Sequence, residues 1–215
     1  MIGLIIHAVV RNRRSEAALD ALQSRGDERP YTLVNAGNLA AVVTEDPAEP
    51  ESTETIRDHG RIVARLLGRS SVVPVPAGLH AENEEAVLGF LDKQRIPFLE
   101  ALDFLEDGYE LRLHLSARGK GQSEDRLRTV AHHVYEALQR QARAARILEE
   151  GGQDKILSAA FLIPKHEWIR FVEQVADWEG RYPTVRMDIT GPWAAWDFVH
   201  VLGVTGEPDR AREEE

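Results

Sequence analysis

Apolar positions in the first half of the chain follow two spacings. A spacing of two residues is typical of strands, and spacings of three and four residues are typical of amphipathic helices. Strands are predicted at residues 2–10, 31–36, 39–44 and 71–75, and helices at residues 15–24, 54–68 and 83–106, the last interrupted at Pro97. The first half therefore mixes strands with helices.

The second half carries the clearest helical pattern. Apolar residues recur at intervals of three and four from Leu127 to Leu148, and Ser123 followed by two acidic residues predicts the helix start. The complete prediction is strands at 109–115, 155–163, 182–189 and 196–204, with helices at 123–148 and about 165–179. The order β-α-β-α-β-β predicts an α+β unit with an antiparallel or mixed sheet and helices on one face.

These patterns predict two α+β domains and a tail. The first domain is expected at residues 1–106 and the second at 107–204, with the boundary close to Gly108. Residues 205–215 are acidic and lack apolar periodicity, so we expect a flexible tail.

Composition and charge exclude several classes of protein. The 215 residues carry a net charge of −10, which argues against attraction to nucleic acid or anionic lipid. Cysteine is absent, which excludes disulfides, thiol nucleophiles and iron–sulfur ligation. No apolar run is long enough to span a membrane, and the arginines follow the first apolar run instead of preceding it, unlike a secretory signal. We therefore expect a cytoplasmic protein.

A search for catalytic or metal-binding motifs finds none. The adjacent His132 and His133 diverge by about 100° on a helix and cannot easily share a metal ion. His59 lies on an apolar helix face, where we expect a buried ring bonded to a backbone or carboxylate partner. No metal-ligand spacing and no nucleophile elbow is present. The sequence thus predicts no metal, no cofactor and no enzymatic activity.

The loop Gly119–Ser123 leaves two interpretations open. It joins a strand to a helix N-terminus, so its amides and Lys120 could bind an anion or a small ligand, with His114, His132 or His133 nearby. This arrangement would suit a ligand-binding domain, possibly enzymatic. The alternative is a flexible connection, because the spacing is not that of a P-loop.

Basic residues are concentrated between Leu111 and Ile147. Eight basic residues oppose three acidic ones there, and Arg126 and Arg140 are among them. The stretch is either a solvated helix face or a docking surface for an acidic partner. Nucleic acid is the less favoured partner, because no aromatic residues alternate with the basic ones.

Aromatic residues gather near the end of the chain. Trp193 and Trp196 flank a turn after Gly191-Pro192, and Phe198 follows. They either anchor an interface or cover the end of the sheet.

The segment Thr190-Gly191-Pro192-Trp193 to Phe198 resembles the C-terminal signature of the GvpF/GvpL family of gas vesicle proteins. Ala194-Ala195 stand where the family has two prolines, and Trp196 stands where it has tyrosine. Three further segments resemble the family in matching order: Arg57-Asp58-His59 with Ser71–Pro74, Glu106–Glu110, and Ser158–Ile163.

This resemblance implies a role in the gas vesicle. Members are thought to bind the small hydrophobic shell protein and assist its assembly, alongside other accessory proteins. The resemblance also implies two α+β domains, the second ferredoxin-like. We expect Trp193, Trp196 and Phe198, together with Arg126 and Arg140, to contact the partner.

Overall fold

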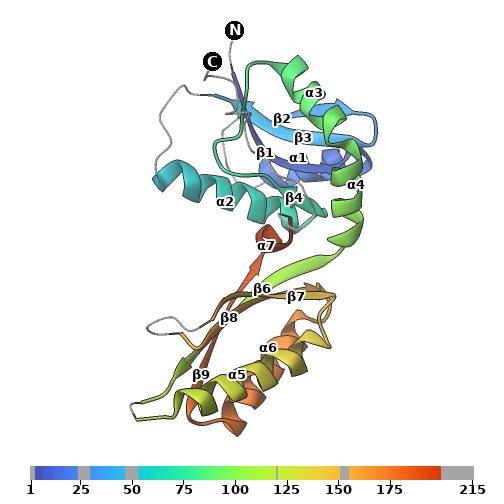
Figure 1. The fold of residues 1–215 in the computed structure, drawn as a ribbon. Coiled ribbons are helices and arrows are strands. Elements are labelled where there is room, and N and C mark those ends of the chain that lie inside the picture. The colour runs from blue at the N-terminus through green and yellow to red at the C-terminus, as the bar shows by residue number, and fades with distance from the viewer. Residues whose placement is uncertain (1–2, 24–29, 47–52, 120, 151–154, 200–215) are drawn as a thin grey trace. The chain divides into compact units, whose positions relative to one another are not determined.

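The computed structural model describes residues 3–23, 30–46, 53–119, 121–150 and 155–199 (Figure 1). These residues form two compact units. The first comprises Met1–Glu106 and, among the described residues after it, Phe198 and Val199, and the second is Asp107–Asp197. The predicted tail, 205–215, lies outside the described residues.

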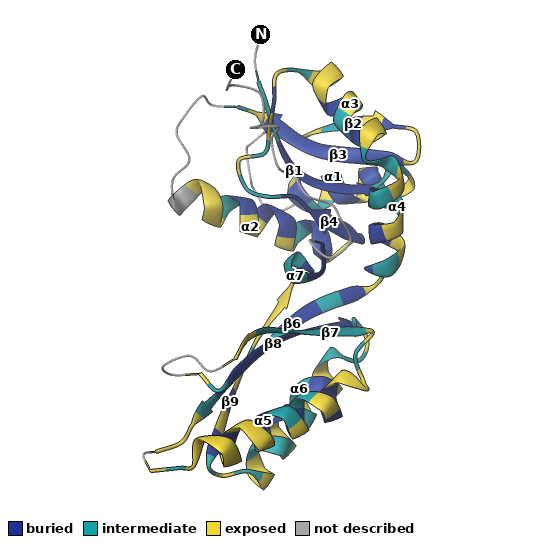
Figure 2. Ribbon diagram, viewed as in Figure 1, coloured by how far each residue is buried: buried dark blue, intermediate teal, exposed yellow. Residues whose placement is uncertain are grey.

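The first unit is built on an antiparallel sheet with the strand order β2-β3-β1-β4, to which β5 adds beside β1. Consecutive residues of β1 and β3 are buried, so both faces of this sheet are covered (Figure 2). Its elements are β1 (Leu4–Arg11), η1 (Asn12–Arg14), α1 (Ser15–Gln23), β2 (Thr32–Ala36), β3 (Leu39–Glu45), α2 (Thr53–Leu67), β4 (Val72–Pro74), β5 (His80–Ala81), α3 (Glu84–Lys93) and α4 (Arg95–Phe104).

The predicted helix at 83–106 is two helices, and the break lies at Gln94 and not at Pro97. Gln94 ends α3 and begins α4, and Pro97 lies in the first turn of α4. A proline is tolerated there because the first amides of a helix have no partner within the helix. Asn83 begins α3 as a true cap, since its side chain accepts a hydrogen bond from the Ala86 amide.

The second unit is a four-stranded antiparallel sheet with the order β7-β8-β6-β9, and α5 and α6 cover one of its faces (Figure 1). Its elements are β6 (Gly108–Ala117), α5 (Glu124–Gln139), β7 (Ala144–Glu150), β8 (Leu157–Pro164), α6 (Trp168–Arg181), β9 (Val185–Trp193) and α7 (Trp196–Val199), the last two residues of which belong to the first unit. Leu111, Leu113 and Leu115 face the helices in its core.

The predicted order β-α-β-α-β-β is wrong in two places. The helix expected to reach residue 148 ends at Gln139, and 144–150 forms the edge strand β7. The second expected strand of the final pair begins instead as the short helix α7, and residues 200–204 lie outside the described residues. The observed order, β-α-β-β-α-β, is the one found in ferredoxin-like folds.

Pairing with β8 explains why residues 144–150 leave the helical pattern. Arg143 donates its amide to the Leu162 carbonyl, and Ile147 lies opposite Ala159. Alanine and leucine fit either conformation, so the sheet contact decides between them.

Candidate functional site

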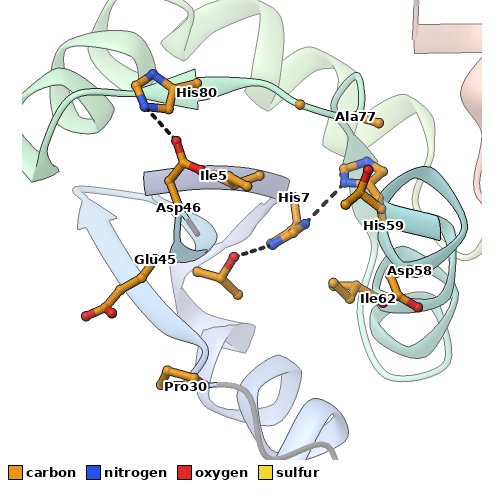
Figure 3. Close-up of a pocket in the computed structure, with 13 residues that line it drawn as sticks. Ile5, His7, Pro30, Glu45, Asp46, Asp58, His59, Ile62, Ala77 and His80 are labelled. Atoms are coloured by element: carbon orange, nitrogen blue, oxygen red, sulfur yellow. Dashed lines mark hydrogen bonds and ion pairs between the residues drawn. The ribbon is translucent and has the colours of Figure 1, made fainter. Parts of the chain in front are cut away.

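A pocket of about 490 Å³ lies in the first unit, where β1 faces α2 (Figure 3). Its apolar lining includes Ile5 and Ile62, and its polar lining includes the three histidines His7, His59 and His80. A cavity of this size with mainly apolar walls and a few polar groups is typical of a binding site.

Four residues around this pocket form one buried chain of hydrogen bonds. His7 and His59 are only 6% and 5% exposed, and their Nδ1 atoms lie 3.2 Å apart. His7 Nε2 lies 2.9 Å from Thr44 Oγ1, and His59 Nε2 lies 2.9 Å from the carbonyl oxygen of Val75. This chain of hydrogen bonds therefore joins β1 to β3 on one side and to α2 on the other.

The hydrogen-bond partners determine which ring nitrogens of His7 and His59 carry a hydrogen. A carbonyl oxygen only accepts, so His59 Nε2 carries a hydrogen and the Nδ1 of a neutral ring is an acceptor. His7 Nδ1 then donates to His59, and His7 Nε2 accepts from the Thr44 hydroxyl. The prediction of a buried His59 bonded to a backbone group is confirmed.

The rim of the pocket carries two pairs of polar side chains. Asp46 Oδ2 lies 3.0 Å from His80 Nε2, and Asp58 Oδ1 accepts from Arg61 at 2.8 Å. The sequence did not single out His7 or His80, because neither stands at a metal-ligand or catalytic spacing from another residue.

The second unit holds a cluster of ionisable side chains on the sheet face that lies away from its helices. Glu110 is fully buried and accepts from Arg112 Nε at 2.7 Å, and the same Nε atom donates to Asp197 Oδ2 at 2.8 Å. Arg146 Nη1 donates to the Asp197 carbonyl at 2.5 Å. Burial, opposed by the hydrogen bond from the Asp197 amide, raises the pKa of Glu110 to about 8.

The turn that resembles the gas vesicle signature is a β-bulge. Glu110 pairs with Trp193 and Arg112 pairs with Thr190, so Leu111 faces both Gly191 and Pro192. Gly191 has a φ of +126°, and a Cβ there would lie 2.8 Å from the Glu110 carbonyl oxygen. Only glycine fits this close approach, which explains the glycine of the motif.

The three aromatic residues of the turn have different surroundings. Trp193 is 46% exposed at the end of β9, and its indole N–H donates to Thr190 Oγ1 at 3.4 Å. Trp196 is half-buried at the start of α7. Phe198 is only 4% exposed, so its side chain does not form part of the surface as expected for a contact residue.

The basic stretch does not form a single patch. Arg126 and Arg140 are both exposed, but they lie at opposite ends of α5, about 21 Å apart at the rise of an α-helix. Arg128 pairs with Glu124, and Arg118 pairs with Glu179. Arg140 therefore lies on a different part of the surface from Arg126.

The residues considered for a ligand site near the loop Gly119–Ser123 do not face one another. His114 Nδ1 lies 2.9 Å from Ser158 Oγ, His132 Nε2 lies 3.3 Å from Glu150 Oε1, and the His133 ring packs edge-on against Trp178. Gly119 and Gly121 have positive φ angles and leave open space around them, as in a simple connection. Lys120 lies outside the described residues.

The described residues contain neither a metal-binding cluster nor a helix able to span a membrane. Within 3–23, 30–46, 53–119, 121–150 and 155–199, no group of three or more histidine or acidic side chains is arranged to hold a metal ion. In the same part of the chain, no helix combines the length and the apolar character needed to cross a bilayer.

Comparisons with known proteins agree on one family. The model of the family described as gas vesicle synthesis protein GvpL/GvpF matches residues 3–120 and 107–200. Gas vesicle protein F1 of Halobacterium salinarum is 24% identical over 198 residues, which cover 87% of this chain and 89% of that protein.

Two crystal structures share the fold. GvpF of Anabaena sp. PCC7120 superimposes with a TM-score of 0.78 at 16% identity, over 93% of this chain and 96% of that one. GvpF of Microcystis aeruginosa superimposes with a TM-score of 0.73 at 13% identity, over 93% and 99% of the two chains.

Proposed function

Because this chain belongs to the gas vesicle GvpL/GvpF family, we propose that it binds the small hydrophobic shell protein of the vesicle and assists its assembly. Other accessory proteins of the vesicle are further partners in this proposal. The proposed function is protein–protein binding without catalysis, and it takes place at the vesicle.

The exposed indole of Trp193 is the observation that carries the proposal. Its one polar atom is bonded to Thr190, so the remaining apolar ring area faces solvent without a polar group to satisfy. Tryptophans with this balance are frequent anchors of protein interfaces. The bulge at Gly191 fixes the backbone from which the ring projects.

The strand that carries Trp193 also has an edge for a partner. Within the described residues β9 pairs with β6 alone, so its other side is an unpaired strand edge. The Met187 amide of β9 already donates to Glu179 Oε1 at 3.4 Å, six residues before Trp193. An extended segment of a shell subunit could add to this edge while its apolar side chains contact Trp193. Binding at this edge would prevent the shell subunit from aggregating with other shell subunits before it joins the vesicle wall.

Co-expression with the host's shell protein tests the proposal. Affinity capture of the full chain should retain soluble shell protein, and omission of the chain should abolish that retention. Trp193→Ala should weaken retention by about tenfold or more, and Trp193→Ala with Trp196→Ala should weaken it further. Ile96→Ala is the matched control, because Ile96 is another exposed large apolar residue but lies on α4.

The experiment distinguishes a wrong function from a wrong binding site. If shell protein is not captured by the parent chain, the binding function is wrong. If the parent captures it and both tryptophan variants do so equally well while correctly folded, the function stands and the Trp193 turn is structural.

A further inference from the structure

A second cavity, of about 410 Å³, lies in the second unit between the end of α5 and the first half of α6. Arg140 and Gln141 line it from the turn after α5. Glu167, which caps the start of α6, lines it with Arg170, Phe171 and Gln174 of that helix. The α6 residues are three or four positions apart, so they share one face of the helix. Phe171 is buried and forms an apolar floor under the polar groups.

Gln174 contributes an unusual group to this cavity. Its Oε1 is buried and has no hydrogen-bond partner among the described residues. Buried acceptors almost always find a donor, because removing one from water without a replacement is unfavourable. Because Gln174 lines the cavity, a bound molecule is one source from which the missing donor can come.

The two arginines are also available for a ligand. Arg140 and Arg170 are exposed, and neither takes part in an ion pair within the described part of the second unit. Glu167 is the one carboxylate in the lining, and its Oε1 lies 3.5 Å from His166 Nε2. Two guanidinium groups and one carboxylate leave an excess of one positive charge, which matches a ligand with a single negative charge.

We propose that this cavity binds an aspartate or glutamate side chain within a peptide segment of a partner protein. The guanidinium groups of Arg140 and Arg170 hold the carboxylate, since arginine donates to carboxylate oxygens in a fixed planar geometry. Gln174 Oε1 accepts a backbone N–H of the same segment. The side chain supplies the charge and the backbone supplies the donor, so a peptide satisfies both features of the cavity.

A peptide fits this lining better than a free phosphate does. Phosphate at neutral pH carries between one and two negative charges, which would oppose Glu167 more strongly than a carboxylate does. Phosphate would also bring mainly acceptor oxygens to Gln174 Oε1, which needs a donor. Binding of a peptide at this cavity does not depend on whether the shell protein is the partner at the Trp193 turn.

Titration of the isotope-labelled full chain with short blocked peptides tests the proposal by nuclear magnetic resonance. The probes are Ac-Ala-Glu-Ala-NH2, its neutral counterpart Ac-Ala-Gln-Ala-NH2, and inorganic phosphate. The glutamate peptide should shift the side-chain signals of Arg170 and Gln174 in a saturable manner, and the glutamine peptide should not. Arg170→Gln, Arg140→Gln and Gln174→Leu should each weaken binding by roughly fivefold or more.

Arg128→Gln is the matched control, because Arg128 is an exposed arginine of α5 that pairs with Glu124 outside the cavity. It should bind the glutamate peptide as the parent does. Equal binding of both peptides, absence of binding, or undiminished binding by well-folded Arg170→Gln and Arg140→Gln would each overturn the proposal. Tighter binding of phosphate than of the glutamate peptide would also overturn it in favour of a free anion.

Discussion

The backbone amide of Asp197 donates a hydrogen bond of 2.8 Å to Oε2 of Glu110, a residue 87 positions earlier. This bond returns the chain after the Trp193 turn to the second residue after the start of β6. The carboxyl group of Glu110 is thereby covered, and its other oxygen is bonded to Arg112. The turn that resembles the family signature is therefore held in place by a buried acid.

The raised pKa of Glu110 predicts a pH-dependent stability. Its folded value of about 8 lies above the ordinary value of 4.5, so the folded chain keeps a proton that the unfolded chain loses between these pH values. Stability should fall as pH rises from about 5 to about 8. Glu110→Gln cannot ionise, so its stability should not fall over this pH range as the parent's does. Its single oxygen can accept from Arg112 or from the Asp197 amide but not from both, so at pH 5 we expect it to be less stable than the parent.

Urea unfolding at both ends of this pH range measures the effect. Glu124→Gln, at the exposed start of α5, serves as the control and should reproduce the parent's pH profile. Parallel profiles for the parent and Glu110→Gln would show that Glu110 does not retain its proton.

Gly191→Ala should destabilise the second unit. The new Cβ would lie 2.8 Å from the Glu110 carbonyl oxygen and 2.9 Å from Leu111 Cδ2, on a backbone with positive φ. We expect a loss of about 2 kcal/mol or more in the free energy of unfolding. Gly89→Ala is the opposite case, because Gly89 lies within α3 with open space around it, and alanine there should stabilise by roughly 0.5–1 kcal/mol. Thermal unfolding of both variants checks the difference in sign.

Gln174→Leu should stabilise the free protein while it removes the acceptor from the cavity. Replacement of an unpartnered buried oxygen by an apolar group relieves the cost of its desolvation, worth about 1 kcal/mol. Chemical denaturation without any peptide measures this gain. A loss of stability instead would mean that the glutamine amide already has a compensating contact in the free chain.

The histidine chain of the first unit should behave as a coupled pair. His7→Leu or His59→Leu alone leaves a buried partner without its hydrogen bond, which costs about 1–3 kcal/mol. The double variant should cost less than the sum, with a coupling energy of about 1 kcal/mol. His132→Leu, a half-exposed residue of α5, is the control and should change stability little. Strict additivity of the two single changes would contradict the bond between the rings.

The sequence predicted the buried faces of helices well where the apolar periodicity was strong. The buried face of α5 from Leu127 to Leu138 and the Phe171–Val175 face of α6 are both confirmed. The end of α5 could not be predicted, because Arg140 to Arg143 contain no glycine or proline and the following residues turn away only to pair with β8. Such pairing is a contact between distant segments that a local pattern does not contain.

The candidate sites were less accessible to sequence reasoning. Alternation along β6 places Glu110 on the polar face with Arg112, which predicts an exposed acid, and only the returning turn at Asp197 buries it. Gln174 is an ordinary polar residue of an amphipathic helix, and its unpartnered oxygen becomes evident only when the end of α5 lies beside it. The burial of His59 could be predicted, because the residue lies on an apolar helix face.

The order of strands has a consequence for synthesis on the ribosome. The central strand β6 leaves the exit tunnel before its neighbours β8 and β9, and β9 ends at Trp193. The second sheet cannot close until nearly all of its residues have been translated, whereas strands β1 to β5 all lie before residue 82 and can pair earlier. Until β9 has been translated, one edge of β6 has no paired strand. A chaperone that covers this edge would therefore protect the second unit of the nascent chain more than the first.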